Sequence, residues 1–286
     1  MIDTLPVRRR LVGATLRRYR EHLGYGLEEA ARVLECDRSK ISRIETGQRG
    51  IRPRDLRDLL SEYGVGESEQ ITLTAIADPR SARGGWWQDY ADILPAARLD
   101  YLALEAIASE ILVYDTQQIP ELLQTPGYAR EVAEAGPVLP EPGTLDRLTE
   151  MSAAHQRMIL DRKSTTLSVI VGEGALRQQV GGADLMREQL RWLGEAGATR
   201  PWITIQVVPF DGGAHPNGGS GPMTILRYAQ AQCLDVVHLP GVGSGACLVD
   251  PADVAGHLRA FTQSQVFALP PHQSAQLIRE LAEAKA

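Results

Sequence analysis

The sequence predicts a multi-domain protein with an all-α amino-terminal domain over residues 1–80 and an α+β domain over residues 81–286. Two observations predict this division. Through the first 77 residues, apolar side chains recur at helical spacing, with glycine or proline where helices should begin and end. After residue 160, β-branched runs bounded by glycine or proline appear among further helical segments. A chain of 286 residues is long enough for two domains.

Five short helices are predicted in the first domain. The third begins at residue 37 and is about nine residues long, and the fifth covers residues 67–77. The helix ends are marked by residues that favour termini: Gly24, Gly47 and Gly64 after the first, third and fourth helices, Pro53 at the start of the fourth, and Asp37 as the N-cap of the third, where its carboxylate would accept backbone N–H groups.

The second domain is predicted to mix helices and strands. Helices are expected over residues 99–114, 145–160, 184–195, 251–265 and 272–284, and strands in "TTLSVIVG", "WITIQVVP", "MTILRY" and "LDVVHLP". The glycine-rich segment 211–222 separates two of these strands and is predicted to be a long hairpin loop. The alternative, a phosphate-binding loop, lacks the G-x-x-x-x-G-K-[ST] pattern.

Composition and charge limit the class of protein. The chain is 43% hydrophobic and 23% charged, which is typical of a globular protein, and its apolar runs are too short to cross a membrane, so we expect a cytoplasmic protein. We expect buried or half-buried thiols at Cys36, Cys233 and Cys247. Residues 1–60 contain 14 basic and 9 acidic residues, a net charge of +5, whereas the remainder carries −11. A basic amino-terminal segment, here called the head, followed by an acidic remainder favours binding of nucleic acid by the head alone.

The segment "CDRSKISRIETGQRG" at residues 36–50 explains this basic head. Ile41 and Ile44 lie on one side of the predicted third helix, while the opposite side carries only side chains that donate hydrogen bonds. Two short helices joined by a tight link, the second with such a face, predict a helix-turn-helix that enters the DNA major groove. The alternative is a solvated polar helix face without a partner.

The segment "LRRYREHLGYGLEEAARVLECDRSKISRIETG" resembles the repressor-type helix-turn-helix, the XRE or Cro and phage-repressor-like class, most specifically in "SKISRIETG". Downstream, "GWWQDYADILP", "YLALEAIASEILVYDTQQIPELLQTPGYAR" and "VVPFDGGAHPNGGSGPMTILRY" resemble the WhiJ-like and antitoxin-like regulators of Streptomyces and other actinobacteria. The resemblance implies a transcription factor whose carboxy-terminal domain of unknown function senses an effector or binds a partner, often a small protein.

The resemblance also implies roles for individual residues. The base-contacting positions fall on Arg38, Ser39 and Arg43, the phosphate-contacting positions on Lys40, Ser42, Arg49 and Arg52, and a structural ion pair on Arg20 and Glu45. One departure stands out: the family usually begins its second helix with Thr-Gln or Ser-Gln, where this chain has Gly26 and Leu27.

Several other features have two interpretations. Arg8, Arg9 and Arg10 form either a minor-groove arm or a solubilising cluster, and the aromatic side chains of Trp86, Trp87 and Tyr90 either line a ligand pocket or dock one domain on another. The six histidines show no metal-binding spacing, so we expect no metal or cofactor. The segment "GVGSG" at residues 241–245 lacks the first glycine of the G-x-S-x-G nucleophile pattern, so we expect no enzyme; the less favoured alternative is an enzyme that uses carboxylates such as Glu105 and Glu110.

The sequence therefore predicts a homodimeric regulator of transcription that binds a pseudo-palindromic double-stranded DNA operator through residues 37–46. It would be controlled by a small-molecule effector or a small partner protein at its second domain. The alternative is an antitoxin-like protein-interaction module that only regulates its own gene.

Overall fold

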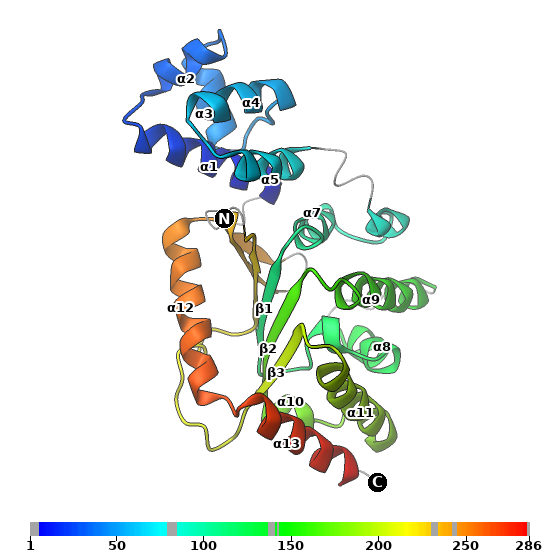
Figure 1. Cartoon of the computed structure of the whole chain (residues 1–286). Helices are drawn as coiled ribbons and strands as arrows, with labels where there is room; N and C mark the ends of the chain where they lie inside the picture. The colour runs from blue at the N-terminus through cyan, green and yellow to red at the C-terminus, as the bar shows by residue number, and fades with distance from the viewer. Residues whose placement is uncertain are drawn as a thin grey trace. The chain divides into compact units, whose positions relative to one another are not determined.

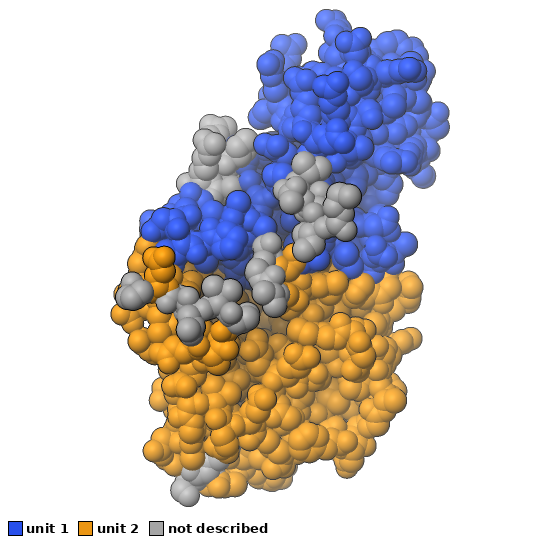
Figure 2. Space-filling view, turned by 180° about the vertical axis from the view of Figure 1, so that it is seen from behind, with its two compact units in different colours: residues 1–107, 227–236, 246–254 blue, residues 108–226, 237–245, 255–286 orange. Residues whose placement is uncertain are grey.

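The computed structural model in Figure 1 describes residues 6–78, 85–136, 141, 143–229, 234–241 and 245–284. The chain forms two compact units, coloured separately in Figure 2. The first comprises residues 1–107, 227–236 and 246–254, and the second residues 108–226, 237–245 and 255–286. The domain boundary predicted at residue 80 falls in 79–84, outside the described residues.

The first unit begins with five helices, which have the bounds α1 Val7–His22, α2 Leu27–Val33, α3 Arg38–Glu45, α4 Pro53–Glu62 and α5 Glu67–Ala77. Gly24, Gly47 and Gly64 have φ angles of 71°, 75° and 67°, the left-handed conformation that ends a helix. The predicted cap of α3 is wrong in one respect. Asp37 precedes the helix in an extended conformation, but its exposed carboxylate makes no capping hydrogen bond. An exposed carboxylate can be hydrated by water, so the backbone N–H groups are not its only available partners.

After α5, the first unit continues with the 3-10 helix Trp86–Tyr90 and with α7 Ala96–Glu105. The three predicted aromatic residues lie on the 3-10 helix and contact one another. The ring of Trp86 lies 5.9 Å from that of Trp87 and 6.2 Å from that of Tyr90, both in edge-to-face geometry, and Trp87 is buried. Their interpretation as ligand-pocket or docking residues remains a prediction.

A six-stranded sheet has the strand order β3-β2-β1-β4-β5-β6. The strands are β1 Glu110–Asp115, β2 Thr166–Gly172, β3 Ile203–Val208, β4 Met223–Arg227, β5 Val236–Leu239 and β6 Ala246–Leu248. β1 pairs in parallel with β2, with Ile111 opposite Leu167, and β2 pairs in parallel with β3. This arrangement confirms the α+β fold class, and the four predicted strands are β2, β3, β4 and β5.

Helices connect and cover the parallel strands, as parallel crossovers require. They are α8 Pro126–Glu134 and α9 Thr144–Leu160 before β2, α10 Glu173–Arg177 and α11 Ala183–Thr199 before β3, and α12 Pro251–Phe267 and α13 Pro271–Glu283 at the end. Figure 1 shows α8, α9 and α11 on one side of β1–β3 and α12 on the other. The sequence did not predict α8, α10 or β6.

The single helix predicted over residues 99–114 is wrong. The chain forms α7 and then turns into β1, whose residues from Ile111 to Asp115 are all buried. A strand buried on both faces is apolar throughout, so its spacing resembles a buried helix as much as a strand.

The hairpin predicted at residues 211–222 is also wrong. The segment connects β3, at one edge of the sheet, to β4, which neighbours β1. β1 and β2 therefore lie between the two strands that the segment joins. Adjacency in sequence favoured a hairpin, but β4 pairs with β1 because β2 already occupies the inner edge of β3.

Candidate nucleic-acid interface

A tight link between α2 and α3 sets the geometry of the site. Glu35 has a φ of 46°, and the Cys36 N–H donates to the Ala31 carbonyl oxygen at 3.0 Å. A residue other than glycine in the left-handed region marks a constrained turn. The two short helices are thereby joined by a constrained link of four residues.

The α3 helix divides into a buried and an exposed face. Ile41 and Ile44 are 1% and 2% exposed and anchor the helix to its neighbours. The three predicted base-contacting residues, Arg38, Ser39 and Arg43, are all exposed, and Lys40 and Ser42 are half-buried beside them. The structure therefore places all three predicted base-contacting side chains on the solvent side.

Gly13 allows α3 to pack closely against α1. A Cβ atom at Gly13 would lie 2.4 Å from the Ile44 carbonyl oxygen and 2.6 Å from that of Glu45. Any other side chain would therefore collide with backbone. Helical periodicity alone does not reveal this role of Gly13, although an isolated glycine inside a helical pattern is a signal of close packing.

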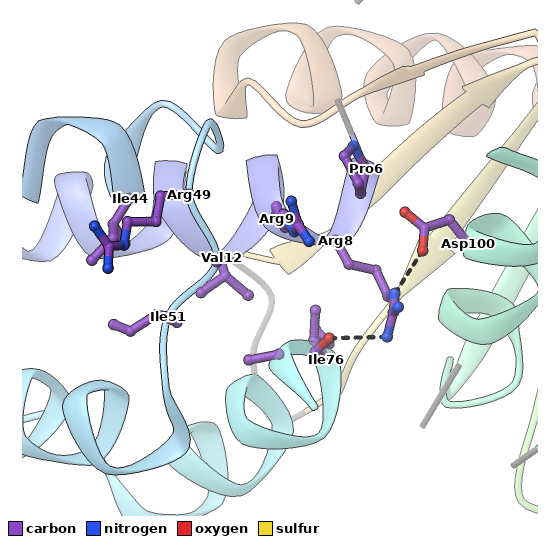
Figure 3. Close-up of a pocket in the computed structure, with 11 residues that line it drawn as sticks. Pro6, Arg8, Arg9, Val12, Ile44, Arg49, Ile51, Ile76 and Asp100 are labelled. Carbon is purple, nitrogen blue, oxygen red and sulfur yellow. Dashed lines mark hydrogen bonds and ion pairs between the residues drawn. The ribbon is translucent and has the colours of Figure 1, made fainter. Parts of the chain in front are cut away.

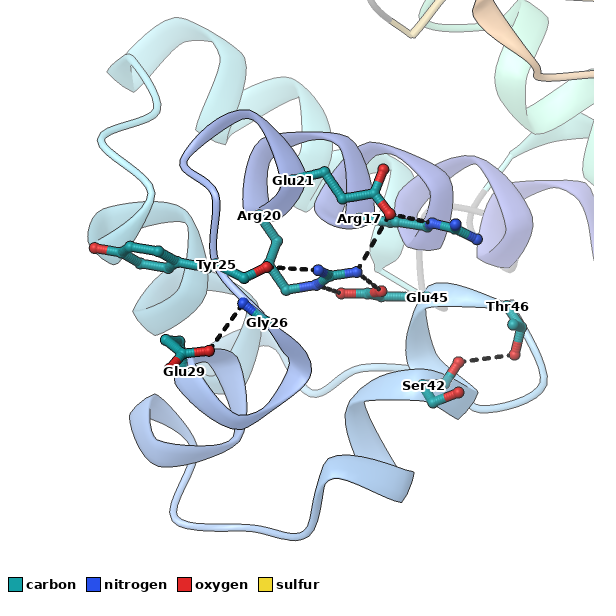
Figure 4. A network of polar contacts seen from close by, with 9 residues as sticks. All are labelled: Arg17, Arg20, Glu21, Tyr25, Gly26, Glu29, Ser42, Glu45 and Thr46. Atoms are coloured by element: carbon teal, nitrogen blue, oxygen red, sulfur yellow. Dashed lines mark hydrogen bonds and ion pairs between the residues drawn. The ribbon is translucent and has the colours of Figure 1, made fainter.

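A buried ion pair fixes the carboxyl end of α3 to α1 (Figure 4). Arg20 Nε donates to Glu45 Oε1 at 2.7 Å and Nη2 to Oε2 at 2.8 Å, so the pair is bidentate. Arg20 Nη1 also donates to the Tyr25 carbonyl oxygen at 2.7 Å. The hydrogen bond to Glu45 raises the pKa of Arg20 above its usual value, against the opposing effect of burial. The structure thus brings together the pair that the resemblance implied.

The cations on α3 differ in their partners. Lys40 Nζ donates to Asp55 Oδ2 of α4 at 2.8 Å, so this predicted phosphate contact also ties two helices together. Arg38 Nη1 lies 3.3 Å from Glu28 Oε1 on the surface of α2. Within the described part of the chain, the Arg43 guanidinium has no hydrogen-bond or ion-pair partner.

The segment after α3 places two more cations beside it. Gly47 ends the helix, and a Cβ there would lie 3.0 Å from Arg10 Cγ. The Arg49 N–H then donates to the Arg43 carbonyl oxygen at 2.9 Å, while the side chains of Arg49 and Arg52 are exposed. Both predicted phosphate contacts therefore lie at the surface, Arg49 beside the end of α3 and Arg52 at the start of α4.

The departure at Gly26 and Leu27 has a local compensation. The Gly26 N–H donates to Glu29 Oε2 at 2.8 Å, which caps the first turn of α2 from within the helix. Leu27 is half-buried and carries no hydrogen-bonding side chain, so it cannot donate to DNA as the glutamine of the Thr-Gln or Ser-Gln pair could.

The described residues were also compared with what a metal site and a membrane-spanning helix require. Among them, no three His, Cys, Asp or Glu side chains group closely enough to hold a metal, and no helix is both long and apolar enough to span a bilayer. Cys36 is half-buried and Cys247 buried, while Cys233 lies outside the described residues.

Two short helices joined by a four-residue link, with the donor-rich face of the second exposed, define a helix-turn-helix protein of the DNA-binding class. Residues 11–71 match the helix-turn-helix domain, and residues 99–280 match a domain of unknown function, DUF5753. The chain belongs to the DUF5753 family. No curated protein and no solved structure matches it.

Proposed function

We propose that this protein is a sequence-specific regulator of transcription that recognises its operator with α3. The observation that carries the proposal is that the exposed side chains of Arg38, Ser39 and Arg43 can all donate hydrogen bonds. The major groove offers acceptors at guanine O6 and N7, which an arginine binds in a bidentate manner. Arg49, Arg52, Ser42 and Lys40 would contact the phosphates.

Selection of binding sites from random duplex DNA with the full chain tests this proposal. An enriched motif is expected, and Arg43→Ala should weaken binding to it by about 1–3 kcal/mol and relax the preference at one base pair. Arg191→Ala, which removes an exposed arginine from α11, is the charge-matched control. Failure to enrich any motif, or an equal loss on specific and random DNA for Arg43→Ala, would contradict the proposal.

The second domain is, in this proposal, a control module and not an enzyme. We infer kinship with the WhiJ-like and antitoxin-like regulators, and a homodimer that places two copies of α3 on a pseudo-palindromic operator. Sedimentation of the full chain should give twice the monomer mass.

A small partner protein is a second candidate regulator of this domain. Phe210 and Val266 in the second unit are 71% and 82% exposed, and exposed apolar side chains that cluster often mark protein interfaces. A groove nearby is lined by His215, Val266 and Phe267. A protein that copurifies from the native host should be lost from Val266→Glu and kept by Met158→Glu, an exposed control on α9. Equal retention by both variants would argue against this surface.

A further inference from the structure

A cavity of about 170 Å³ lies inside the first unit, where α1, the α3–α4 loop, α5 and α7 meet (Figure 3). The apolar side chains of its lining are those of Pro6, Val12, Ile44, Ile51, Ile76 and Ala77. An engineered protein cavity of about 150 Å³ binds benzene. This cavity therefore has room for a small organic molecule of about ten non-hydrogen atoms.

Two arginines border the apolar lining. Arg9 and Arg49 are exposed, and neither guanidinium has a hydrogen-bond or ion-pair partner among the residues that the structure describes. A Cβ placed on Gly50 would lie 3.6 Å from Arg9 Nε, so the Arg9 side chain reaches the loop that carries Arg49. Two uncompensated guanidinium groups beside an apolar surface favour a carboxylate attached to an apolar body.

The opposite side of the cavity presents an acceptor. Asp100 Oδ1 accepts a hydrogen bond from Arg8 Nε at 2.9 Å, but Asp100 Oδ2 is buried and has no hydrogen-bond partner. Arg8 is held in place because it also donates to the Asp78 carbonyl oxygen at 3.2 Å. A buried acceptor without a donor is unfavourable, so a hydroxyl group of a ligand would stabilise it. In Figure 3, Asp100 and Arg49 lie on opposite sides of the lining.

We infer that this cavity binds a small hydroxylated organic monoanion, with its carboxylate on Arg9 and Arg49, its apolar body over Ile51 and Ala77, and its hydroxyl directed toward Asp100. The regulatory consequence rests on the proposed function, in which Arg49 contacts a DNA phosphate. The ligand and the operator then compete for Arg49, and the cavity also touches α3 through Ile44. Each should lower the affinity of the protein for the other, because coupling between two binding sites is reciprocal.

The first experiment measures ligand binding without DNA. The full chain is titrated calorimetrically with 4-hydroxybenzoate, which has the required size, charge and hydroxyl group. Benzoate, which lacks the hydroxyl donor, should bind several-fold more weakly, and the neutral 4-hydroxybenzamide about tenfold more weakly. No binding of 4-hydroxybenzoate up to about 10 mM, or equal binding of the amide, would overturn the inference.

Two pairs of variants locate the bound ligand. Ala77→Phe fills the cavity and should abolish binding, whereas Ala75→Phe adds the same side chain to a half-buried position of α5 that does not line the cavity. Arg9→Gln should weaken binding of 4-hydroxybenzoate about tenfold and leave the weak binding of the amide unchanged. Arg17→Gln, also on α1, is its control. Unaltered binding in Ala77→Phe, with its helical content intact by circular dichroism, would place the ligand elsewhere.

The second experiment measures the coupling. Saturating 4-hydroxybenzoate should lower the affinity of the full chain for its selected operator about five- to tenfold, and Ala77→Phe should be insensitive. Ligand binding with no change in operator affinity would overturn the regulatory part of the inference. If the protein bound no DNA sequence, the proposed function would be refuted. The calorimetric titration without DNA would still test independently whether the cavity binds the ligand.

Discussion

A single glycine sets the distance between α1 and α3, and this gives a prediction at the scale of one residue. Gly13→Ala removes a residue with poor helix propensity, which alone would stabilise α1 by about 1 kcal/mol. The added methyl group meets two backbone carbonyl oxygens within 2.6 Å, however, so the helices must separate. We expect a net loss of about 1–3 kcal/mol in the free energy of unfolding, measured by urea denaturation.

Gly194→Ala on α11 is the matched control for this substitution. There the new Cβ would lie 3.8 Å from Ile278 Cγ2, an ordinary contact, so this variant should be neutral or slightly more stable. If Gly13→Ala were as stable as Gly194→Ala, the close approach of the two helices would not exist in solution.

Cys247 gives a prediction about pH. Burial raises the pKa of its thiol to about 11, and the nearby Arg10 only partly offsets this effect. A raised pKa means that the folded state favours the protonated thiol, so the stabilisation is complete below the usual value of 9.0 and is lost as the pH rises toward about 11. The loss should amount to about 2–3 kcal/mol.

The measurement compares the full chain with Cys247→Ala between pH 8 and pH 11. Burial also raises the pKa of Tyr228, and the charge on Cys247 adds a smaller effect to it. Because Cys247→Ala keeps Tyr228 buried, the main tyrosine contribution is common to both proteins, and the difference in unfolding free energy reports chiefly the thiol. The wild-type chain should lose stability more steeply with rising pH. Parallel curves would show that Cys247 is accessible to water in the folded protein.

At the scale of helices and strands, the contact between α2 and α3 predicts a substitution that raises the affinity for the operator. Glu28 lies 3.3 Å from Arg38, and both side chains are exposed. The pKa of Glu28 is lowered by a hydrogen bond from backbone and by Arg38, so it carries a negative charge near the DNA-facing surface. Glu28→Gln should raise operator affinity two- to fivefold at low salt, and the gain should shrink as salt screens the charge.

Fluorescence anisotropy at two salt concentrations checks this prediction, with Glu28→Gln compared with Glu188→Gln, an exposed acidic residue of α11. Both variants change the net charge by the same amount. A similar effect of the two substitutions would show that Glu28 acts through the overall charge and has no particular position beside the operator.

The burial pattern of each helix and strand explains which of them could be predicted from the sequence. α1 to α5 each bury one face, so their apolar spacing and their terminal glycines located them to within one or two residues. β1 has no exposed face, and Ile111 and Leu112 fitted a helix equally well. The pairing of β4 with β1 depends on contacts between distant segments, which periodicity does not record.

The residues of the candidate site likewise fall into those that local sequence spacing could predict and those that it could not. Arg38, Ser39 and Arg43 could be placed on the outer face of α3 because Ile41 and Ile44 define the inner one. The partners of Lys40 and Asp100, by contrast, are Asp55 and Arg8, 15 and 92 residues away in the chain. Local spacing cannot predict such pairs, so the cavity beside Asp100 emerged only from the structure.

At the scale of the whole molecule, the proposed homodimer makes a prediction about operator geometry. Two half-sites about 34 Å apart lie on the same face of the duplex, so both heads can bind at once. Binding of the second head is then intramolecular, with an effective concentration on the order of millimolar, and the dimer should bind at least about a hundredfold more tightly than one head alone.

Insertion of about five base pairs between the half-sites rotates one of them by about half a turn to the opposite face of the DNA. We therefore expect the affinity for that operator to fall to the value of a single half-site. An insertion of about ten base pairs returns both half-sites to the same face of the duplex. Part of the lost affinity should then be recovered, because only the distance between the half-sites still differs. Equal affinity for all three operators, measured by anisotropy with the full chain, would mean that each head binds DNA independently and that the dimer has no part in recognition.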